Sequence, residues 1–216
     1  VLQKALFDAW NIPFAVTVGV TIFLIFLYTR KGGIKTVIWT DTVQTLVLVG
    51  TVVLCIYQIA DSMNLSFAGM VKSISESDLS RIWFFDNWQD SRYFFKQFLA
   101  GAFTTITMTG LDQDMMQKNL SCRSLKDAKK NMYSYSIAFL PINLIFLSLG
   151  VLLVMFAQQH GILVPSHTDD LFPTIATGIN PATGELYLGT LVGVLFILGI
   201  ISAAYSSADS ALTALT

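Results

Sequence analysis

Apolar runs long enough to cross a lipid bilayer alternate with polar segments along this chain. A membrane-spanning helix needs about 20 mostly apolar residues. The runs cover residues 13–29, 35–60, 93–113, 133–157 and 187–213. The pattern therefore predicts an all-α transmembrane fold with five spanning helices.

Lysine and arginine are distributed unevenly between the polar segments. The turn at residues 30–35 and the segment at residues 112–132 are rich in them, whereas residues 158–185 contain neither. Because basic loops are retained in the cytoplasm, we expect the N-terminal end outside the cell and the C-terminal end in the cytoplasm. Segments 61–92 and 158–186 are then the outer loops.

The third predicted span, residues 93–113, is unusual for its threonines and glycines. Such a sequence suits a helix that loosens in mid-membrane and offers backbone carbonyls to a site. It equally suits a polar seam between packed helices. In the fourth span, Pro141 predicts a kink, and Asn143 is one of the few strongly polar side chains.

Composition supports a membrane protein, because 54% of the 216 residues are hydrophobic and only 12% are charged. A soluble domain has about 25% charged residues. The net charge of −1 and the lack of a basic run argue against nucleic acid as a partner. Membrane lipid is the partner that we expect instead.

Cys55 and Cys122 lie far apart in the sequence, and we expect neither a disulfide nor a metal site from them. His160 and His167 lie in a loop without further metal ligands, and no nucleophile is paired with a base, so we do not expect an enzyme.

The last span ends in a polar stripe. At about 100° per residue, one face of this helix carries Ser202, Ser206, Asp209 and Thr213. An ionisable group within a membrane is costly unless it faces a cavity, a partner or an ion, so the stripe predicts an ion or substrate pathway. The alternative is a tight helix crossing of small residues whose hydroxyls bond back to their own helix.

Asp41 lies near the start of the second span, in the same half of the bilayer as Asp209. Two helices that carry an acid and hydroxyls at matching depth can surround a hard cation with oxygen ligands, which suits sodium or a proton relay. The alternative is an interfacial acid paired with a loop lysine such as Lys35.

Three segments together resemble the sodium/solute symporter family, which includes the sodium/glucose cotransporters. The first is residues 32–44, with a glycine pair followed by Trp39, Thr40, Asp41 and Gln44. The second is residues 112–128, similar to an Asp-Gln-x-x-x-Gln-Arg-x-Leu-Ser loop, with Lys118 in place of the arginine. The third is residues 203–210, similar to a small-x-x-Ser-Ser/Thr-x-x-Ser helix.

This resemblance implies the LeuT-type inverted-repeat fold. By this comparison, residues 1–216 are a partial transporter domain that runs from the end of core helix 3 through core helix 8, and helices 1, 2, 9 and 10 are missing. The resemblance further implies a sodium-coupled symporter of the cell membrane, which moves a small organic solute or anion by alternating access and needs no cofactor besides the ion. The alternative is a symporter-like sensor domain fused to a signalling module. A channel is disfavoured because no filter motif is visible.

The resemblance also assigns candidate sodium ligands. The common sodium site of the family lies between helices 1 and 8, and its helix 8 ligands correspond to the Ala203 carbonyl and the Ser206 and Ser207 hydroxyls. A second, more cytoplasmic site occurs in some members, and its residues correspond to Asp41, Ser206, Asp209 and Ser210. Because members with this site can carry serine where this chain has Asp209, one sodium, two sodium ions or a proton all stay open.

Solute contacts are less similar to the family pattern. Sugar carriers of the family close over the substrate with a tyrosine and a tryptophan on helix 6, at positions that correspond here to Met108 and Thr109. This departure argues against glucose as the solute. The candidates for the solute pocket are Thr105, Met108, Thr109 and Asn143.

Overall fold

The structure, a computed structural model, describes the backbone of residues 12–181 and 183–215, and the side chains of these residues except 28–37, 114, 207 and 209–215. The chain is mostly helical, and within the described ranges the extended pairing is limited to an isolated bridge between Ile179 and Leu186. The helices are α1 (Phe14–Ser62), α2 (Phe67–Glu76), η3 (Asp78–Ser80), α3 (Phe94–Leu111), α4 (Gln113–Leu120), α5 (Leu125–Gln159), η4 (Thr168–Asp170), α6 (Leu171–Thr177) and α7 (Gly189–Leu215).

Three stretches of helix are long and apolar enough to cross a membrane. They are Ile38–Ser62 in α1, Leu125–Gln159, which is the whole of α5, and Gly189–Ser206 in α7. A shorter apolar stretch, Phe14–Leu27, forms the first part of α1. The second, fourth and fifth predicted spans thus have apolar helices of spanning length, whereas spans at residues 13–29 and 93–113 stay predictions.

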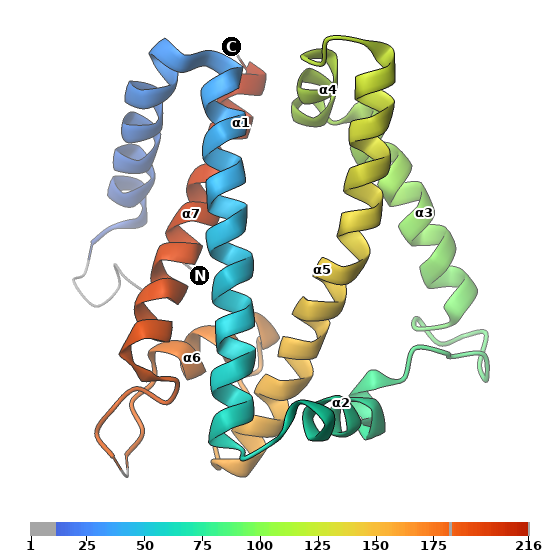
Figure 1. The fold of residues 1–216 in the computed structure, drawn as a ribbon, viewed down its shortest axis with the longest axis vertical. Coiled ribbons are helices and arrows are strands. Elements are labelled where there is room, and N and C mark those ends of the chain that lie inside the picture. Colours follow the sequence, from blue (N-terminus) through green and yellow to red (C-terminus); the bar gives the residue numbers. More distant parts are fainter. Residues whose placement is uncertain (1–11, 182, 216) are drawn as a thin grey trace.

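α1 is one continuous helix by its hydrogen bonds, but it has two arms. Figure 1 shows its path reversing direction between the arms, so that the first arm runs beside the bundle and the second runs through it. The reversal falls near residues 30–35, the turn that we predicted between the first two spans.

The buried core lies at one end of the bundle, where the second arm of α1 meets α5, α6 and α7. This end is at the bottom of Figure 1. Its largest fully buried side chains include Ile59, Leu152, Phe156, Ile175 and Leu188. Gly193 allows α7 to approach α6 here, because a Cβ atom at this position would lie 3.2 Å from the carbonyl oxygen of Ala176. Close contacts of this kind favour glycine at helix crossings in membranes.

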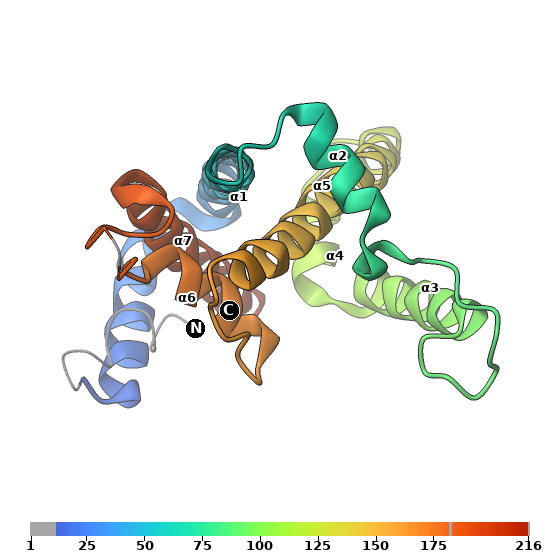
Figure 2. The same cartoon turned by 90° about the horizontal axis from the view of Figure 1, so that it is seen from below.

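α3 stands away from this core. Figure 2 shows α3 on one side of α5 and α7 on the other. None of the described residues of α3 is buried. Its apolar surface, with Phe103 and Ile106 both about two-thirds exposed, is therefore open to lipid or to other protein segments.

α3 is an unbroken helix over its described length, and it does not loosen there as the first of the two alternatives suggested. The hydroxyl of Thr105 donates to the Gly101 carbonyl at 2.8 Å, and that of Thr107 donates to the Phe103 carbonyl at 2.9 Å. Hydroxyls that bond back to their own helix are satisfied without a partner helix. The threonines therefore do not by themselves require a break in α3.

The charged segment at residues 112–132 is more helical than we predicted. It contains α4, and α5 begins at Leu125 rather than near residue 133. The hydroxyl of Ser124 accepts from the backbone N–H of Asp127 at 3.2 Å and donates to the Asp127 carboxylate at 2.7 Å. This N-cap satisfies a backbone group that would otherwise lack a partner, so the helix extends into charged sequence.

Candidate functional site

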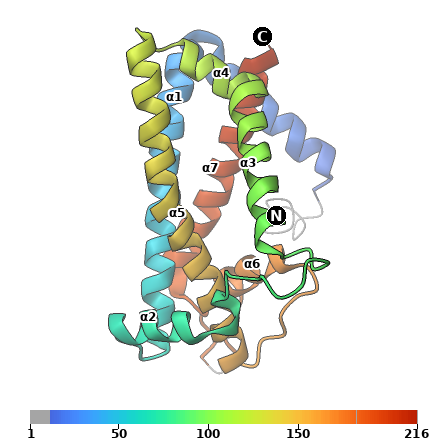
Figure 3. The ribbon, with the colours of Figure 1, turned by 90° about the vertical axis from the view of Figure 1, so that its right-hand side faces the viewer.

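Asp41 on α1 and Ser206 on α7 meet where these two helices pack side by side. The hydroxyl of Ser206 donates to Oδ1 of Asp41 at 2.6 Å, although the two residues are 165 positions apart. Figures 1 and 3 show α7 running alongside the second arm of α1. Ser206, one residue of the polar stripe, thus faces the acid that the sequence indicated.

The second oxygen of Asp41 is bound by a lysine. Nζ of Lys118, on α4, lies 2.9 Å from Oδ2 of Asp41. The side chains of Asp41 and Lys118 are only 20% and 25% exposed. The alternative in which Asp41 pairs with a lysine therefore has a described partner in Lys118. The side chain of Lys35, the lysine that we named from the sequence, lies outside the described residues.

A cavity of about 420 Å³ adjoins this cluster, between α1, α4 and α5. Asp41, Thr45, Lys118, Asn119 and Tyr135 are among its lining residues. The hydroxyl of Thr45 donates to the backbone carbonyl of Asp41 at 2.8 Å. One side of the Asp41 carboxylate therefore faces this cavity, and the other side accepts the hydrogen bond from Ser206 on α7.

Ala203, one turn before Ser206, lines a separate cavity of about 220 Å³ between α1, α5, α6 and α7. Asp169 and Phe172 border the same cavity. Ala203 and Ser206 are therefore on the same stretch of α7, but Ala203 faces this cavity whereas Ser206 bonds to Asp41. The side chains of Ser207, Asp209 and Ser210 lie outside the described residues.

The four candidates for the solute pocket do not line the cavities described here. Thr105 and Met108 are exposed on α3, and Thr109 is half-buried. The amide of Asn143 on α5 donates to the Phe139 carbonyl of its own helix at 2.8 Å. None of the four borders the 420 Å³ or the 220 Å³ cavity.

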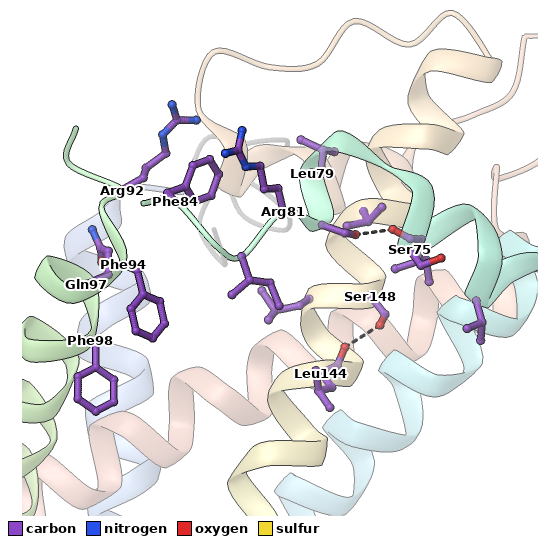
Figure 4. Close-up of a pocket in the computed structure, with 16 residues that line it drawn as sticks. Ser75, Leu79, Arg81, Phe84, Arg92, Phe94, Gln97, Phe98, Leu144 and Ser148 are labelled. Carbon is purple, nitrogen blue, oxygen red and sulfur yellow. Dashed lines mark hydrogen bonds between the residues drawn. The ribbon is translucent and has the colours of Figure 1, made fainter. Parts of the chain in front are cut away.

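A third cavity, of about 690 Å³, lies between α2, α3 and α5 (Figure 4). Its walls are mainly apolar and include Phe94 and Phe98 on α3. Two guanidinium groups at its edge, those of Arg81 and Arg92, lie over the ring of Phe84 at 4.9 and 4.8 Å. Each arginine is also paired with a carboxylate, Arg81 with Asp86 and Arg92 with Asp90.

The ion pair of Arg92 and Asp90 spans 3.0 Å. Hydrogen bonds from the Arg92 side chain and backbone hold the pKa of the Asp90 carboxyl below its usual range. Because both arginines at this edge already have carboxylate partners, the 690 Å³ cavity has little net charge to offer an ion.

Gln44 was not among the predicted site residues, although it belongs to the motif at residues 32–44. It lies three residues after Asp41 on α1, so the two side chains are neighbours on one helix face, about 5–6 Å apart at Cβ. Its Oε1 atom is buried and has no hydrogen-bond partner among the described residues. A buried carbonyl oxygen without a donor is costly, and an oxygen of this type is also a ligand for a hard cation.

We expect Gln44→Met to raise the melting temperature of the full-length protein, because it removes the unsatisfied oxygen and keeps the volume of the side chain. Relief of such a group is worth about 1–3 kcal/mol. Thermal unfolding in detergent measures the effect, and Gln58→Met on the same helix is the control. A Gln44→Met protein that is less stable only when sodium is present would show instead that the oxygen serves as an ion ligand.

The chain is similar to known proteins over nearly its whole length. The family model of the Sodium:solute symporter family matches residues 2–216. The sodium/sialic acid symporter SiaT of Proteus mirabilis (strain HI4320) is 27% identical over 201 residues, which are 89% of this chain and 38% of that protein. Human sodium-coupled monocarboxylate transporter 2 is 28% identical over 223 residues, 97% of this chain and 32% of that protein.

A third relative, the sodium-dependent multivitamin transporter of rabbit (Oryctolagus cuniculus), is 31% identical over 156 residues, 70% of this chain and 23% of that protein. The chain thus spans about a third of the length of the first two relatives. No solved structure matches it significantly. Since the family model covers nearly all 216 residues, the chain belongs to the sodium:solute symporter family.

Proposed function

We propose that this chain is part of a sodium-coupled symporter of the cell membrane, which moves a small organic solute by alternating access in a LeuT-type fold. The observation that carries the proposal is the contact between Asp41 and Ser206, which joins an acid and a hydroxyl on two apolar helices. A charged group at this position is costly without a cation or a partner. Lys118 is one such partner, and family membership supports sodium as the ion coupled to solute movement.

The first proposed sodium site uses the Ala203 carbonyl and the Ser206 and Ser207 hydroxyls of α7. A hydroxyl has one donor and two acceptor lone pairs. Because the hydrogen of Ser206 points to Asp41 at 2.6 Å, its lone pairs are free to accept a cation. The carboxylate therefore orients Ser206 for ion binding even where it does not touch the ion.

The second proposed cation site adds Asp41 to the end of the α7 stripe, with Ser206, Asp209 and Ser210. Ser206 is common to both sites, which gives a physical route for coupling between them. A cation that draws the Asp41 carboxylate away from Ser206 changes the orientation of a ligand of the first site.

We further propose that the end of the bundle with α4 faces the cytoplasm. The basic residues at 118–130 belong to α4 and the start of α5, and basic segments are retained on the cytoplasmic side. This end is at the top of Figure 1, together with the last described residues of α7. Asp41 then lies on the side from which sodium is released, and the packed core lies towards the outside.

The proposed solute is a small organic anion with a carboxylate. Two of the relatives are named for sialic acid and for monocarboxylates, both of which carry this group. Thr105, Met108, Thr109 and Asn143 are the pocket residues that we propose, on α3 and α5. Met108 and Thr109 replace the aromatic pair of the sugar carriers, which is consistent with a solute other than glucose.

Uptake by the full-length protein in proteoliposomes tests this proposal. Sialic acid, pyruvate, lactate, biotin and glucose are supplied in radioactive form under an inward sodium gradient and, as a control, an equal potassium gradient. We expect sodium to stimulate uptake of at least one carboxylate and not of glucose. Equal uptake of every carboxylate in sodium and potassium would overturn the assignment.

A further inference from the structure

The first two turns of α5 carry three lysines on one face. These are Lys126, Lys129 and Lys130, which fall within a sector of about 100° at about 100° per residue. All three side chains are exposed, and none of them forms an ion pair with a described carboxylate. This face of α5 therefore presents three positive charges.

The other side of the same turns is joined to α4. The amide of Asn131 donates to Oδ1 of Asn119 at 3.4 Å, and the amide of Asn119 donates to Sδ of Met132 at 3.3 Å. Asn131 and Met132 lie more than about 100° from the middle of the lysine sector. Asp127, the acid in these turns, also lies outside the sector, and its carboxylate accepts the hydroxyl of Ser124 at 2.7 Å. The lysines are therefore directed away from α4.

Beyond the lysines the same face becomes aromatic and then aliphatic. Tyr133, Ile137, Leu140 and Leu144 continue the sector, and each is between 63% and 71% exposed. Tyr133 and Leu144 are about 16 Å apart along the axis at 1.5 Å per residue, which is about half of the 30 Å hydrocarbon core of a bilayer. Tyrosine is enriched at the level of the headgroups. Charge, aromatic ring and aliphatic surface thus follow one another in the order of a single leaflet.

We propose that this face of α5 binds an anionic phospholipid of the cytoplasmic leaflet. The lipid phosphate lies among Lys126, Lys129 and Lys130, and an acyl chain runs along Tyr133 to Leu144. The inference goes beyond the proposed function and takes from it only the orientation of the bundle, which assigns the leaflet.

The physical reason is charge complementarity at the membrane surface. Basic side chains next to a spanning helix attract the anionic lipids of the cytoplasmic leaflet, and an ammonium group is a strong donor to phosphate oxygens. The apolar stem of a lysine can lie along the helix while its charged end reaches the headgroups. A zwitterionic lipid has the same phosphate but also a positive group, which the lysines repel. Arg123, in the turn before α5, is exposed and adds to the positive charge at this end.

Native mass spectrometry of the purified full-length protein tests the inference by measuring the affinity of the first bound lipid. The probes are dioleoyl phosphatidylglycerol, which is anionic, and dioleoyl phosphatidylcholine, which is zwitterionic. We expect the unaltered protein to bind phosphatidylglycerol at least about tenfold more tightly than phosphatidylcholine. Glycerol phosphate, a headgroup without acyl chains, should not compete.

Three variants separate the lysine face from the rest of the protein. Replacing Lys126, Lys129 and Lys130 together with glutamine should weaken phosphatidylglycerol binding at least about tenfold. Replacing the same three with arginine keeps the charge and should keep the affinity. The control, Lys72→Gln with Lys96→Gln, removes two lysines outside α5 and should also keep it.

Several outcomes would overturn the inference. Equal affinity of the unaltered protein for the two lipids would mean that another protein segment covers this face, and displacement by glycerol phosphate would mean that the ligand is a soluble phosphate. Unchanged affinity of the glutamine variant, or an equal loss in the arginine variant, would show that the charge of these lysines does not bind the lipid. Should the glutamine variant fail to fold, the comparison of the two lipids on the unaltered and arginine proteins still decides. The buffer contains no sodium, so a failure here leaves the proposed function as it stands.

Discussion

Replacing Ser206 and Ser207 together with alanine is expected to abolish sodium-stimulated uptake by the full-length protein. The change removes two of the three oxygen ligands that we propose on α7, and one of them, the Ser206 hydroxyl, is oriented by Asp41 at 2.6 Å. A hydrogen bond or ligand contact to a charged group is worth about 1.5–3 kcal/mol. Losing two should weaken activation by sodium at least about a hundredfold.

The measurement is the initial rate of uptake as a function of sodium concentration. A matched control replaces Ser136 and Ser148 on α5 with alanine, because their hydroxyls donate to carbonyls of their own helix at 2.9 and 2.7 Å. This control should keep the sodium dependence of the unaltered protein. If the protein with alanine at positions 206 and 207 keeps the sodium dependence of the unaltered protein, the first proposed sodium site is wrong.

Asp41→Asn is expected to lower the melting temperature strongly, since asparagine keeps the shape of the side chain but removes the counter-charge of Lys118. The Lys118 ammonium would then lose the Asp41 carboxylate in a largely shielded position, and the Ser206 hydroxyl would lose a charged acceptor. The expected loss of unfolding free energy is about 1.5–3 kcal/mol. Thermal unfolding of the purified full-length protein measures it.

A double-mutant cycle that combines Asp41→Asn with Lys118→Met measures the energy of the ion pair separately from the other contacts of Asp41. In direct contact the two residues should show a coupling energy of about 0.5–3 kcal/mol. Asp61→Asn near the other end of α1 is the matched control, because Asp61 is exposed, and its effect should stay within about 0.5 kcal/mol. Additive effects of Asp41→Asn and Lys118→Met would mean that the ion pair contributes nothing in the folded protein.

Both predictions depend on Ser206, which connects Asp41 to the first proposed sodium site. If sodium binding at α7 and the state of Asp41 are coupled, the coupling is reciprocal. Asp41→Asn should therefore also shift the sodium concentration needed for half-maximal uptake. The structure provides a short physical path for this effect, namely one hydrogen bond between two packed helices.

Much of the helical organisation follows directly from the sequence. The apolar runs at residues 35–60, 133–157 and 187–213 correspond to the three helices suited to crossing a membrane. Insertion of a helix depends on its own length and hydrophobicity, so local sequence is sufficient to predict it. The helix α4 and the early start of α5 were missed, because a cap such as that of Ser124 and Asp127 overrides the low hydrophobicity of the segment.

Only the tertiary structure decided what Asp41 contacts. From the sequence, Asp41 and the stripe of α7 were expected at matching depth, yet the lysine suggested as a partner was Lys35, a near neighbour in the chain. The observed partner, Lys118, is 77 residues away and reaches Asp41 because α3 and the contacts of Asn119 place α4 across the end of the bundle. Pairing between distant residues depends on the packing of several helices at once, which no local pattern contains, whereas the spans themselves depend only on local apolar length.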